Sequence, residues 1–422
     1  MRICRLAFVA VAMVGICTSR EGLANGYKIL CVRSTKATAM GEAFIAQADD
    51  PTAVAFNPAG LGQVTGVQVS VHGTLCNAFI EHTARGGGST DNESPWQLVP
   101  SAFIAGDFGV EGMGFGLGIT VPNGLSSEWA EDSFARYVAT FSDLQVADVS
   151  PALAVEVGGR LRLGAGLNLL YSRARLEKMI DWGAPAGFPG MFDGEQVLKS
   201  EGTGYGFNLG AIFAVNAKHR IACTYRSPVT VDYDGDLTLR DIPPAAGMGT
   251  TLKVDAEASI DYPASVVLGY AWMPTERCKV EVNLDWTDWD PVDSITVEFD
   301  APGMADAVLA QDFHNTIAYK LGAEYLLNQT LALRGGYIYN QNATDEEAWR
   351  PSLVDTDSHL LSAGVGCRLG DVTVDAAVQL VFYEPRSIDN NVDMNESISS
   401  STVDGKYEGW APCVSLGATY RF

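Results

Sequence analysis

The last nine residues of the chain, VSLGATYRF (414–422), alternate without a break between two kinds of side chain. Val414, Leu416, Ala418, Tyr420 and Phe422 share one face, while serine, glycine, threonine and arginine share the other. A period of two indicates a β-strand with different surroundings on its two faces. A strand that separates lipid from a polar lumen has this pattern. The aromatic residue at the very end looks like the assembly signal of an outer-membrane barrel.

The same alternation recurs upstream in blocks that are separated by turn signals. The connections alternate between tight turns and long polar loops, as the periplasmic turns and outer loops of a membrane barrel do. We therefore predict an all-β fold, a transmembrane antiparallel β-barrel. Its fourteen strands are expected at residues 66–79, 97–107, 112–121, 146–157, 160–175, 202–215, 218–232, 254–272, 276–299, 312–327, 330–341, 358–369, 371–384 and 406–422.

A soluble β-sandwich or propeller is the alternative fold for many short strands. The apolar faces of the blocks have no partner layer in the sequence, and charged residues project from the opposite faces. Unpaired charges cannot fill a soluble core, whereas they can pair across a wet lumen or against a plug. From their positions in the alternating pattern, we expect the following charged residues to point into the lumen: Asp148, Glu156, Arg220, Arg226, Glu281, Asp285, Lys320, Glu324, Arg334, Arg368 and Asp375.

Residues 1–24 have the features of a cleavable signal peptide. Arg2 and Arg5 precede an apolar stretch, and residues 22–24 provide a cleavage site of mostly small residues. A lipoprotein signal at Cys17 is the alternative, but Ile16 stands where a small residue is needed. No later apolar run reaches the ~18 residues that a spanning helix requires. We therefore expect export to the outer membrane and passage through it by strands.

The mature chain is acidic. Removing residues 1–24 leaves 25 basic residues (28 − 3) and 50 acidic residues (51 − 1), a net charge of −25. This excess disfavours nucleic acid as a partner. Six cysteines remain and form no CxxC pair, so a disulfide framework is not expected. In an oxidising compartment, Cys31 with Cys76 is the pairing that we consider most compatible with the sequence.

Residues 25–65 break the alternation and are rich in alanine. The spacing of small residues predicts a short helix between Thr38 and Gln47, and Asp50-Pro51 and Asn57-Pro58 mark turns. We expect this compact segment to plug the charged lumen. A periplasmic linker is the alternative. The predicted organisation is a signal peptide at 1–24, an N-terminal hatch at 25–65 and a barrel at 66–422.

The run AMGEAFIAQADDPTAVAFNPAGL (39–61) resembles the hatch of the FadL/TodX family of outer-membrane transport proteins, whose members carry an NPA motif there. Weaker similarities at 225–228, 286–289 and 333–337 extend the resemblance over the mature chain. It implies a fourteen-stranded barrel that is plugged by its hatch. The corresponding hatch motif here is Asp49, Asp50, Pro51, Asn57, Pro58 and Ala59.

The resemblance also implies a lateral opening at a kinked third strand. The corresponding strand contains Gly114, Gly116 and Gly118 and ends at Pro122. Glycine favours a kink or a bulge. Alternatively, these glycines let the hatch backbone approach the wall closely.

The function that the resemblance implies is passive transport of hydrophobic small molecules, such as long-chain fatty acids, without a cofactor or a metal. We expect a monomer that contacts its cargo, outer-membrane lipid and lipopolysaccharide. Candidate cargo contacts are apolar loop residues and cations for a carboxylate headgroup, although loop packing and pairing with acids are alternative roles. They are Trp129, Phe134, Phe141, Met179, Trp182, Phe188, Phe192, Arg173, Arg175, His314, Lys320 and Arg334.

Enzymatic motifs of the GxSxG, HExxH and GxxxxGK[ST] kinds do not occur in the sequence. A barrel phospholipase would need an outward Ser and His pair, for which His359 has the right parity. We therefore expect that the protein is not an enzyme. A porin for polar solutes is the more serious alternative, because a charged lumen favours it while a hatch does not.

Overall fold

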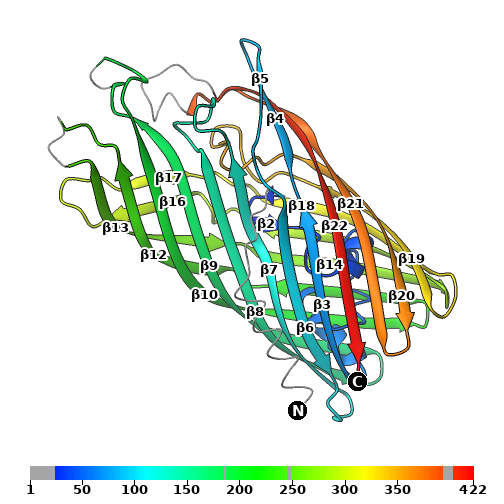
Figure 1. The fold of residues 1–422 in the computed structure, drawn as a ribbon. Coiled ribbons are helices and arrows are strands. Elements are labelled where there is room, and N and C mark those ends of the chain that lie inside the picture. Colours follow the sequence, from blue (N-terminus) through cyan, green and yellow to red (C-terminus); the bar gives the residue numbers. More distant parts are fainter. Residues whose placement is uncertain (1–23, 185–186, 245–248, 393–402) are drawn as a thin grey trace.

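The computed structural model describes residues 24–184, 187–244, 249–392 and 403–422. The predicted signal peptide therefore lies almost entirely outside the described residues. The described strands form one antiparallel sheet that closes into a barrel of fourteen wall strands (Figure 1). None of the helices in the described ranges is long and apolar enough to span a membrane.

Nine wall strands are single elements, and five consist of two elements in line. The single ones are β6 (Gln97–Gly106), β7 (Met113–Glu128), β8 (Phe141–Val157), β9 (Leu161–Asp181), β10 (Asp193–Asn216), β19 (Leu331–Asn340), β20 (Ser358–Leu369), β21 (Val372–Ile388) and β22 (Gly405–Arg421). The double ones are β3 (Val67–Cys76) with β4 (Phe79–Ala84), β11 (His219–Arg226) with β12 (Val229–Arg240), β13 (Thr251–Tyr262) with β14 (Ala264–Thr275), β15 (Cys278–Asp288) with β16 (Ser294–Phe299), and β17 (Ala307–Ala310) with β18 (Thr316–Leu326). A short strand, β5 (Ser89–Asp91), folds back on β4.

The last strand closes the barrel on the first. β22 pairs with β3 from Cys413↔Cys76 to Arg421↔Gln68, and with β4 from Gly405↔Ala84 to Trp410↔Phe79. The predicted antiparallel barrel of fourteen strands is therefore confirmed. Several strands are longer than predicted, β9 and β10 above all, because their upper parts continue the ladder where the lipid-facing alternation has already ended.

The predicted outward face is the lipid-facing face. On β22, Leu416 is 61% exposed while the neighbouring Ser415 is 1% exposed. Apolar side chains ring the outside at the same level on the other strands, including Leu167, Leu209, Leu268, Leu284, Leu321 and Leu380. This band is what a bilayer requires of a barrel wall.

Above this band the alternation changes phase. In β11, Ile221 faces outward, whereas in β12 Val231 and Tyr233 are buried and Asp232 and Asp234 are exposed. The change occurs at Ser227-Pro228, where proline cannot donate to the ladder. A second change occurs at Pro263 between β13 and β14. The upper barrel is therefore apolar inside and polar outside.

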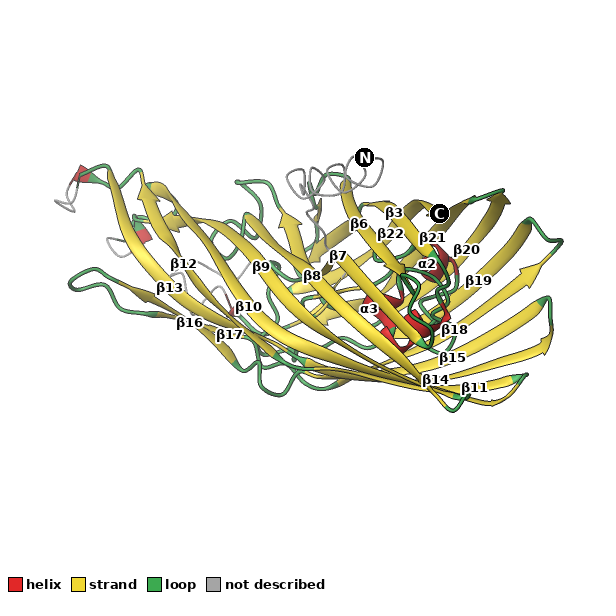
Figure 2. Ribbon diagram, turned by 90° about the horizontal axis from the view of Figure 1, so that it is seen from below, coloured by secondary structure: helices red, strands yellow, loops and turns green. Residues whose placement is uncertain are grey.

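The hatch (residues 25–65) lies inside the barrel, as the view from below shows (Figure 2). It contains a hairpin of β1 (Ala24–Asn25) and β2 (Lys28–Ile29), two short helices, α2 (Thr35–Ala39) and α3 (Ala53–Phe56), and a 3-10 helix, η1 (Pro58–Gln63). Most of its described side chains are buried. Their small size lets the hatch backbone pack against the wall.

The helix expected between Thr38 and Gln47 is misplaced in the sequence prediction. α2 begins after its N-cap Ser34 and ends at Met40, because Gly41 and Glu42 both adopt left-handed backbone conformations. The turn places the Glu42 carboxylate in the lumen, where it accepts a hydrogen bond from the Cys31 amide at 2.9 Å. Alanine spacing alone therefore predicted a helix where a polar contact requires a turn.

Candidate functional site

The wall has a window between β6 and β7. These strands pair only from Gly106↔Phe115 up to Ala102↔Ile119 within the described residues. Above this point β7 bends into the lumen and pairs with the hatch, where the Gly124 amide donates to the Tyr27 carbonyl at 2.9 Å. At the top, the connection that leads into β6 meets the end of β7, where the Glu93 amide donates to the Glu128 carbonyl at 2.9 Å. The ladder is thus interrupted between two closed points.

The kink that produces this window lies at Val121-Pro122, where the ladder to β8 shifts register. Gly114, Gly116 and Gly118 lie below it, on the part of β7 beside β6. A Cβ at Gly114 would be 2.3 Å from the Leu61 carbonyl oxygen, and one at Gly116 would be 2.5 Å from Val54. Of the four residues predicted for the opening, Pro122 is at the kink, and the glycines instead admit the hatch.

Hatch residues close the window from inside. Ile29 and Val32 form a buried apolar cluster with Val99 of β6 and Val121 of β7. The Ser101 hydroxyl donates to the Arg33 carbonyl at 2.9 Å, across the same interruption. The four side chains replace the missing ladder with apolar packing, which is easier to separate than a row of backbone hydrogen bonds.

An apolar cavity of 180 Å³ occupies the upper lumen. It is more than ten times the ~15 Å³ that a single water requires. Its lining comes from seven wall strands, from Tyr27 of the hatch and from connections between strands. The larger apolar members on the wall are Leu125, Leu144, Leu176, Leu198, Ile260, Ile295, Val297, Phe299, Leu309 and Leu353. Charged side chains such as Glu177, Lys178 and Arg350 also border the cavity, but apolar side chains provide most of its surface. Such a lining suits an alkyl chain or an aromatic ring.

Tyr27 forms the floor of this upper cavity. Its hydroxyl donates to Gln311 at 2.8 Å, and its ring contacts Phe313, Trp289 and Tyr262 at centroid distances of 5.5, 6.2 and 6.4 Å. Tyr27 belongs to the hatch and the other three rings belong to the wall, so the four rings form an aromatic constriction between hatch and wall.

A second cavity, of 90 Å³, lies below the constriction and borders Pro122 and Asn123 at the window. Ile29, Ile45, Val54 and Phe56 provide its apolar part. Four cations, Lys28, Arg33, Arg226 and Lys320, also line it. This lower cavity is therefore amphipathic, unlike the upper one.

The four cations exceed their acidic partners. Lys28 and Lys320 each bind Asp285 at 2.8 Å, Lys320 also binds Glu42 at 3.1 Å, and Arg226 binds Asp148 at 2.8 Å. Four cations against three carboxylates leave a net charge of +1 for these seven groups. Burial lowers the pKa of Lys28 even though Asp285 and its hydrogen bond oppose the change. The charged amine is therefore incompletely compensated, and an additional anion would stabilise it.

Charges also anchor the hatch lower down. Asp49 binds Lys36 at 2.5 Å and Lys279 of the wall at 3.0 Å. The Glu281 carboxylate accepts the Ala46 and Gln47 amides at 2.8 and 3.0 Å. Of the predicted hatch motif, Asp49 therefore links hatch to wall, and Asp50 orders its own turn by accepting the Thr52 amide at 2.9 Å.

The NPA segment fastens the hatch to β10. The Asn57 side-chain oxygen accepts the Ala59 amide at 3.1 Å and so caps η1, with Pro58 at its first position. Its side-chain amide donates to the carbonyls of Ile45 at 2.9 Å and Ala211 at 3.3 Å. The asparagine amide serves here as acceptor and donor at once.

The aromatic loop candidates lie away from both cavities. Trp129 is buried and donates to the Pro351 carbonyl at 3.1 Å, and Phe134 stacks on His82. Phe141 lies under the Arg175 guanidinium, while Phe188 and Phe192 are exposed at a loop. Met179 and Trp182 pack near the end of β9, where Trp182 joins a satellite cluster. These residues therefore pack in, or lie exposed on, the outer part of the barrel, and none of them lines either cavity.

The cationic candidates divide into three locations. Lys320 lines the lower cavity, while Arg334 is committed to Glu324 at 2.8 Å and Asp375 at 2.5 Å. Arg173 and Arg175 face outward, in a polar groove that lies outside the wall between Trp96 and β8 to β12. His314 lines neither cavity, because it lies in the connection before β18 and pairs with Asp345 of another loop at 3.1 Å.

The apolar cavity lining was missed by sequence reasoning. Continuing the parity of the lipid-facing band along a whole strand predicts a polar inner face throughout. The signal was present in VTVDYDGDLTLR (229–240), where the apolar set resumes after Pro228 in the opposite phase. A proline followed by alternation in the other phase marks the point where a wall leaves the membrane.

The geometry agrees with the comparisons to known proteins. The model of the outer membrane protein transport protein family (OMPP1/FadL/TodX) matches residues 15–422. The chain belongs to this family. It is a barrel of the outer membrane, where the named relatives of this family are located.

FadL/TodX relatives are similar over most of their length. The long-chain fatty acid transport protein of Escherichia coli K12 is 23% identical, with 94% of each chain covered. Outer membrane protein P1 of Haemophilus influenzae is 24% identical over 77% of this chain and 78% of its own.

Two solved structures show the same fold. A FadL homologue of Pseudomonas aeruginosa has a TM-score of 0.81 at 19% identity, covering 94% of this chain and all of its own. The toluene transporter TodX of Pseudomonas putida has a TM-score of 0.73 at 19% identity, covering 95% and 99%. At these identities the likeness shows the fold, and the cargo has to be argued from the cavities.

Proposed function

We propose that this protein carries amphipathic hydrophobic molecules, of which long-chain fatty acids are the best fit, passively across the outer membrane. The observation that carries the proposal is the order of the cavities along the hatch. An apolar cavity leads to an aromatic constriction, then to an amphipathic cavity, and this second cavity ends at a window in the wall. We also propose that the protein is exported with a signal peptide that is cleaved near residue 24, and that it is a monomer.

The chemistry of the two cavities favours a molecule with one anionic end. Burial of each CH₂ contributes about 0.8 kcal/mol, so an alkyl chain gains enough to leave water and loses little on passing between similar sites. The net charge of +1 around the lower cavity provides a partner for one carboxylate. A neutral hydrocarbon would use the upper cavity equally well but would leave Lys28 incompletely compensated.

The exit is lateral in this proposal. Movement of residues 27–33 opens the Tyr27 constriction and removes Ile29 and Val32 from the window in one step, because they are on one short segment. The cargo then enters the membrane through the wall. The outward Arg173 and Arg175 lie in a polar groove beside Trp96, and in this proposal they attract the carboxylate of the cargo or the phosphates of lipopolysaccharide.

A matched pair of variants on β17 tests the cargo path. Leu309 lines the upper cavity, whereas its neighbour Val308 is 62% exposed on the outside. Leu309→Glu places a charge in the cavity and should lower uptake of a labelled long-chain fatty acid at least tenfold, by the ~1.4 kcal/mol or more that a misplaced charge costs. Val308→Glu should leave uptake unchanged.

Uptake is measured in cells that lack their own transporter, with barrel assembly checked by heat-modifiable migration in gels. Equal uptake by both variants would rule out the upper cavity as the path. Planar-bilayer recordings address the porin alternative. A large, stable open current of the unmodified protein would contradict the transport proposal.

A further inference from the structure

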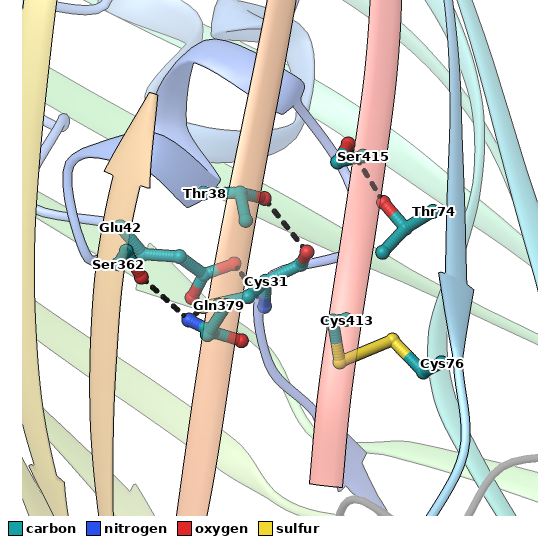
Figure 3. The surroundings of a disulfide bond; sticks show 9 residues. All are labelled: Cys31, Thr38, Glu42, Thr74, Cys76, Ser362, Gln379, Cys413 and Ser415. Atoms are coloured by element: carbon teal, nitrogen blue, oxygen red, sulfur yellow. Dashed lines mark hydrogen bonds between the residues drawn. A yellow bond between two sulfur atoms is a disulfide. The ribbon is translucent and has the colours of Figure 1, made fainter.

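A disulfide joins the first and the last wall strand at the seam of the barrel, where β3 pairs with β22. Cys76 of the first wall strand and Cys413 of the last are direct partners in the β3–β22 ladder and form a disulfide (Figure 3). The sequence expectation of a Cys31–Cys76 disulfide is therefore not what the structure contains, and Cys31 is a free thiol. All three are buried, and they belong to one cluster.

Cys31 lies beside this disulfide. Its sulfur accepts a hydrogen bond from the Gln379 side-chain amide at 2.8 Å. Gln379 is the direct partner of Cys413 across the β21–β22 ladder. Directly opposed residues have Cβ atoms about 5 Å apart. The thiol of the hatch and the disulfide of the wall are therefore neighbours on the lumen face, as Figure 3 shows.

The hatch is also fixed to the seam close to this point, through Thr35. The Thr35 and Ser415 hydroxyls are 2.8 Å apart, and the Thr74 hydroxyl donates to Ser415 at 2.9 Å. The Cys31 carbonyl accepts the Thr38 hydroxyl at 2.7 Å. Cys31 also stands between Ile29 and Val32, the two side chains that close the window. A covalent bond at Cys31 would therefore hold the window closed.

We propose that Cys31, Cys76 and Cys413 form a thiol–disulfide exchange set that can tether the hatch to the seam of the barrel. In the exchange, the Cys31 thiolate attacks the Cys413 sulfur, a Cys31–Cys413 bond forms, and the Cys76–Cys413 bond breaks. Cys76 leaves as a thiolate and takes up the proton that Cys31 lost. The number of disulfides is unchanged, so the step requires no oxidant.

The seam disulfide is the resting pairing. Burial, reinforced by the nearby Glu42 charge, raises the pKa of the Cys31 thiol. A protonated thiol is a poor nucleophile. Exchange is therefore slow while the hatch is seated, and it becomes faster when the segment around Cys31 loosens and meets water.

Disulfide mapping of the purified full-length protein tests this inference. Cys76→Ser should form a Cys31–Cys413 disulfide under mild oxidation, and Cys413→Ser should form Cys31–Cys76, each in most molecules. In the double variant Cys31→Ser with Cys76→Ser, Cys413 should remain alkylatable. Cys223, exposed on the outside of β11, is the control thiol and should stay unpaired in every variant.

Alkylation of both Cys31 and Cys413 in oxidised Cys76→Ser would overturn the inference. If that variant does not assemble, the unmodified protein is partly reduced and reoxidised instead. Recovery of some Cys31–Cys413 or Cys31–Cys76 peptide would then support exchange, and recovery of the seam disulfide alone would refute it.

The tether's effect on transport rests on the proposed function and is tested separately. Oxidised Cys76→Ser should take up fatty acid several-fold more slowly than the same protein after reduction, and the double variant should not respond to oxidation. A cross-link that forms without affecting uptake would leave the exchange intact and contradict the lateral exit. Failure of the cross-link to form would refute the exchange. The lateral exit and the cargo path would then be judged from the β17 variants alone.

Discussion

Glu42 shows how much one hatch residue contributes. It is buried, lies on a strained left-handed turn, and binds Lys320 of the wall and Arg33 of the hatch at 3.1 and 3.4 Å. Burial opposes its ionisation, but the two cations outweigh burial and lower its pKa to about 2. A carboxyl with a lowered pKa stabilises the folded state above its ordinary pKa and loses this contribution as the pH falls through the lowered one.

Glu42→Gln should therefore destabilise the protein at neutral pH by about 3 kcal/mol and by much less near pH 2. Lys320 and Arg33 would lose a charged partner at pH 7, whereas in acid the unmodified carboxyl is itself becoming neutral. Thermal unfolding in detergent at pH 7 and pH 2 measures the difference. Glu257→Gln, at an exposed position on β13, is the control. A Glu42→Gln effect that is equal at both pH values would contradict this role.

At the scale of an element, β7 combines two tasks in one strand. Its lower half is a regular wall strand with glycines that receive the hatch, and its upper half leaves the wall to make the window. The division falls at Val121-Pro122, where a register shift and a residue without an N–H coincide. The hatch therefore contacts the same strand that forms one edge of the window.

Gly116→Val should displace the hatch while leaving the barrel assembled. The new side chain would collide with Val54 of α3, and overpacking of this kind costs about 1–3 kcal/mol. We expect faster proteolysis of the hatch and a measurable ion current in planar bilayers. The matched control is Gly335→Val on β19, where the nearest atom to a new Cβ is 3.9 Å away. Identical behaviour of the two variants would show that Gly116 does not set the hatch position.

At the scale of the molecule, the wall and the hatch are held by different forces. Apart from the window between β6 and β7, wall strands are joined by backbone ladders, and a disulfide joins the seam. The hatch is joined to the wall mainly by ion pairs, side-chain hydrogen bonds and packing of small residues. The closed ladder satisfies nearly every backbone group of the wall, so the wall does not depend on its plug.

Removal of residues 25–65 should therefore leave a barrel that still inserts but conducts ions freely. The inward carboxylates and cations would then line a water-filled lumen, in which they are hydrated. Planar-bilayer recording should show a large steady current that the complete protein lacks. A deletion variant that fails to assemble, while Gly116→Val assembles normally, would show instead that the hatch acts as a folding core.

The wall could be predicted because it depends on local alternation. Each strand must present apolar side chains to lipid, and the face of a residue follows from its position in the strand. The strand number, the antiparallel order and the inward charges such as Asp285 and Lys320 were all available from VSLGATYRF (414–422) and its counterparts. The plug composition of residues 25–65 was equally visible.

The candidate site could not be predicted in the same way, because it depends on contacts between distant segments. Only the tertiary structure places Tyr27 against Trp289, Cys31 against Gln379 and Glu42 against Lys320. It also decides that β7 leaves the wall at Pro122 and that the apolar face turns inward after Pro228. Alternation fixes which side of a strand a residue occupies, whereas the partner that it meets there is set by how the barrel closes around the hatch.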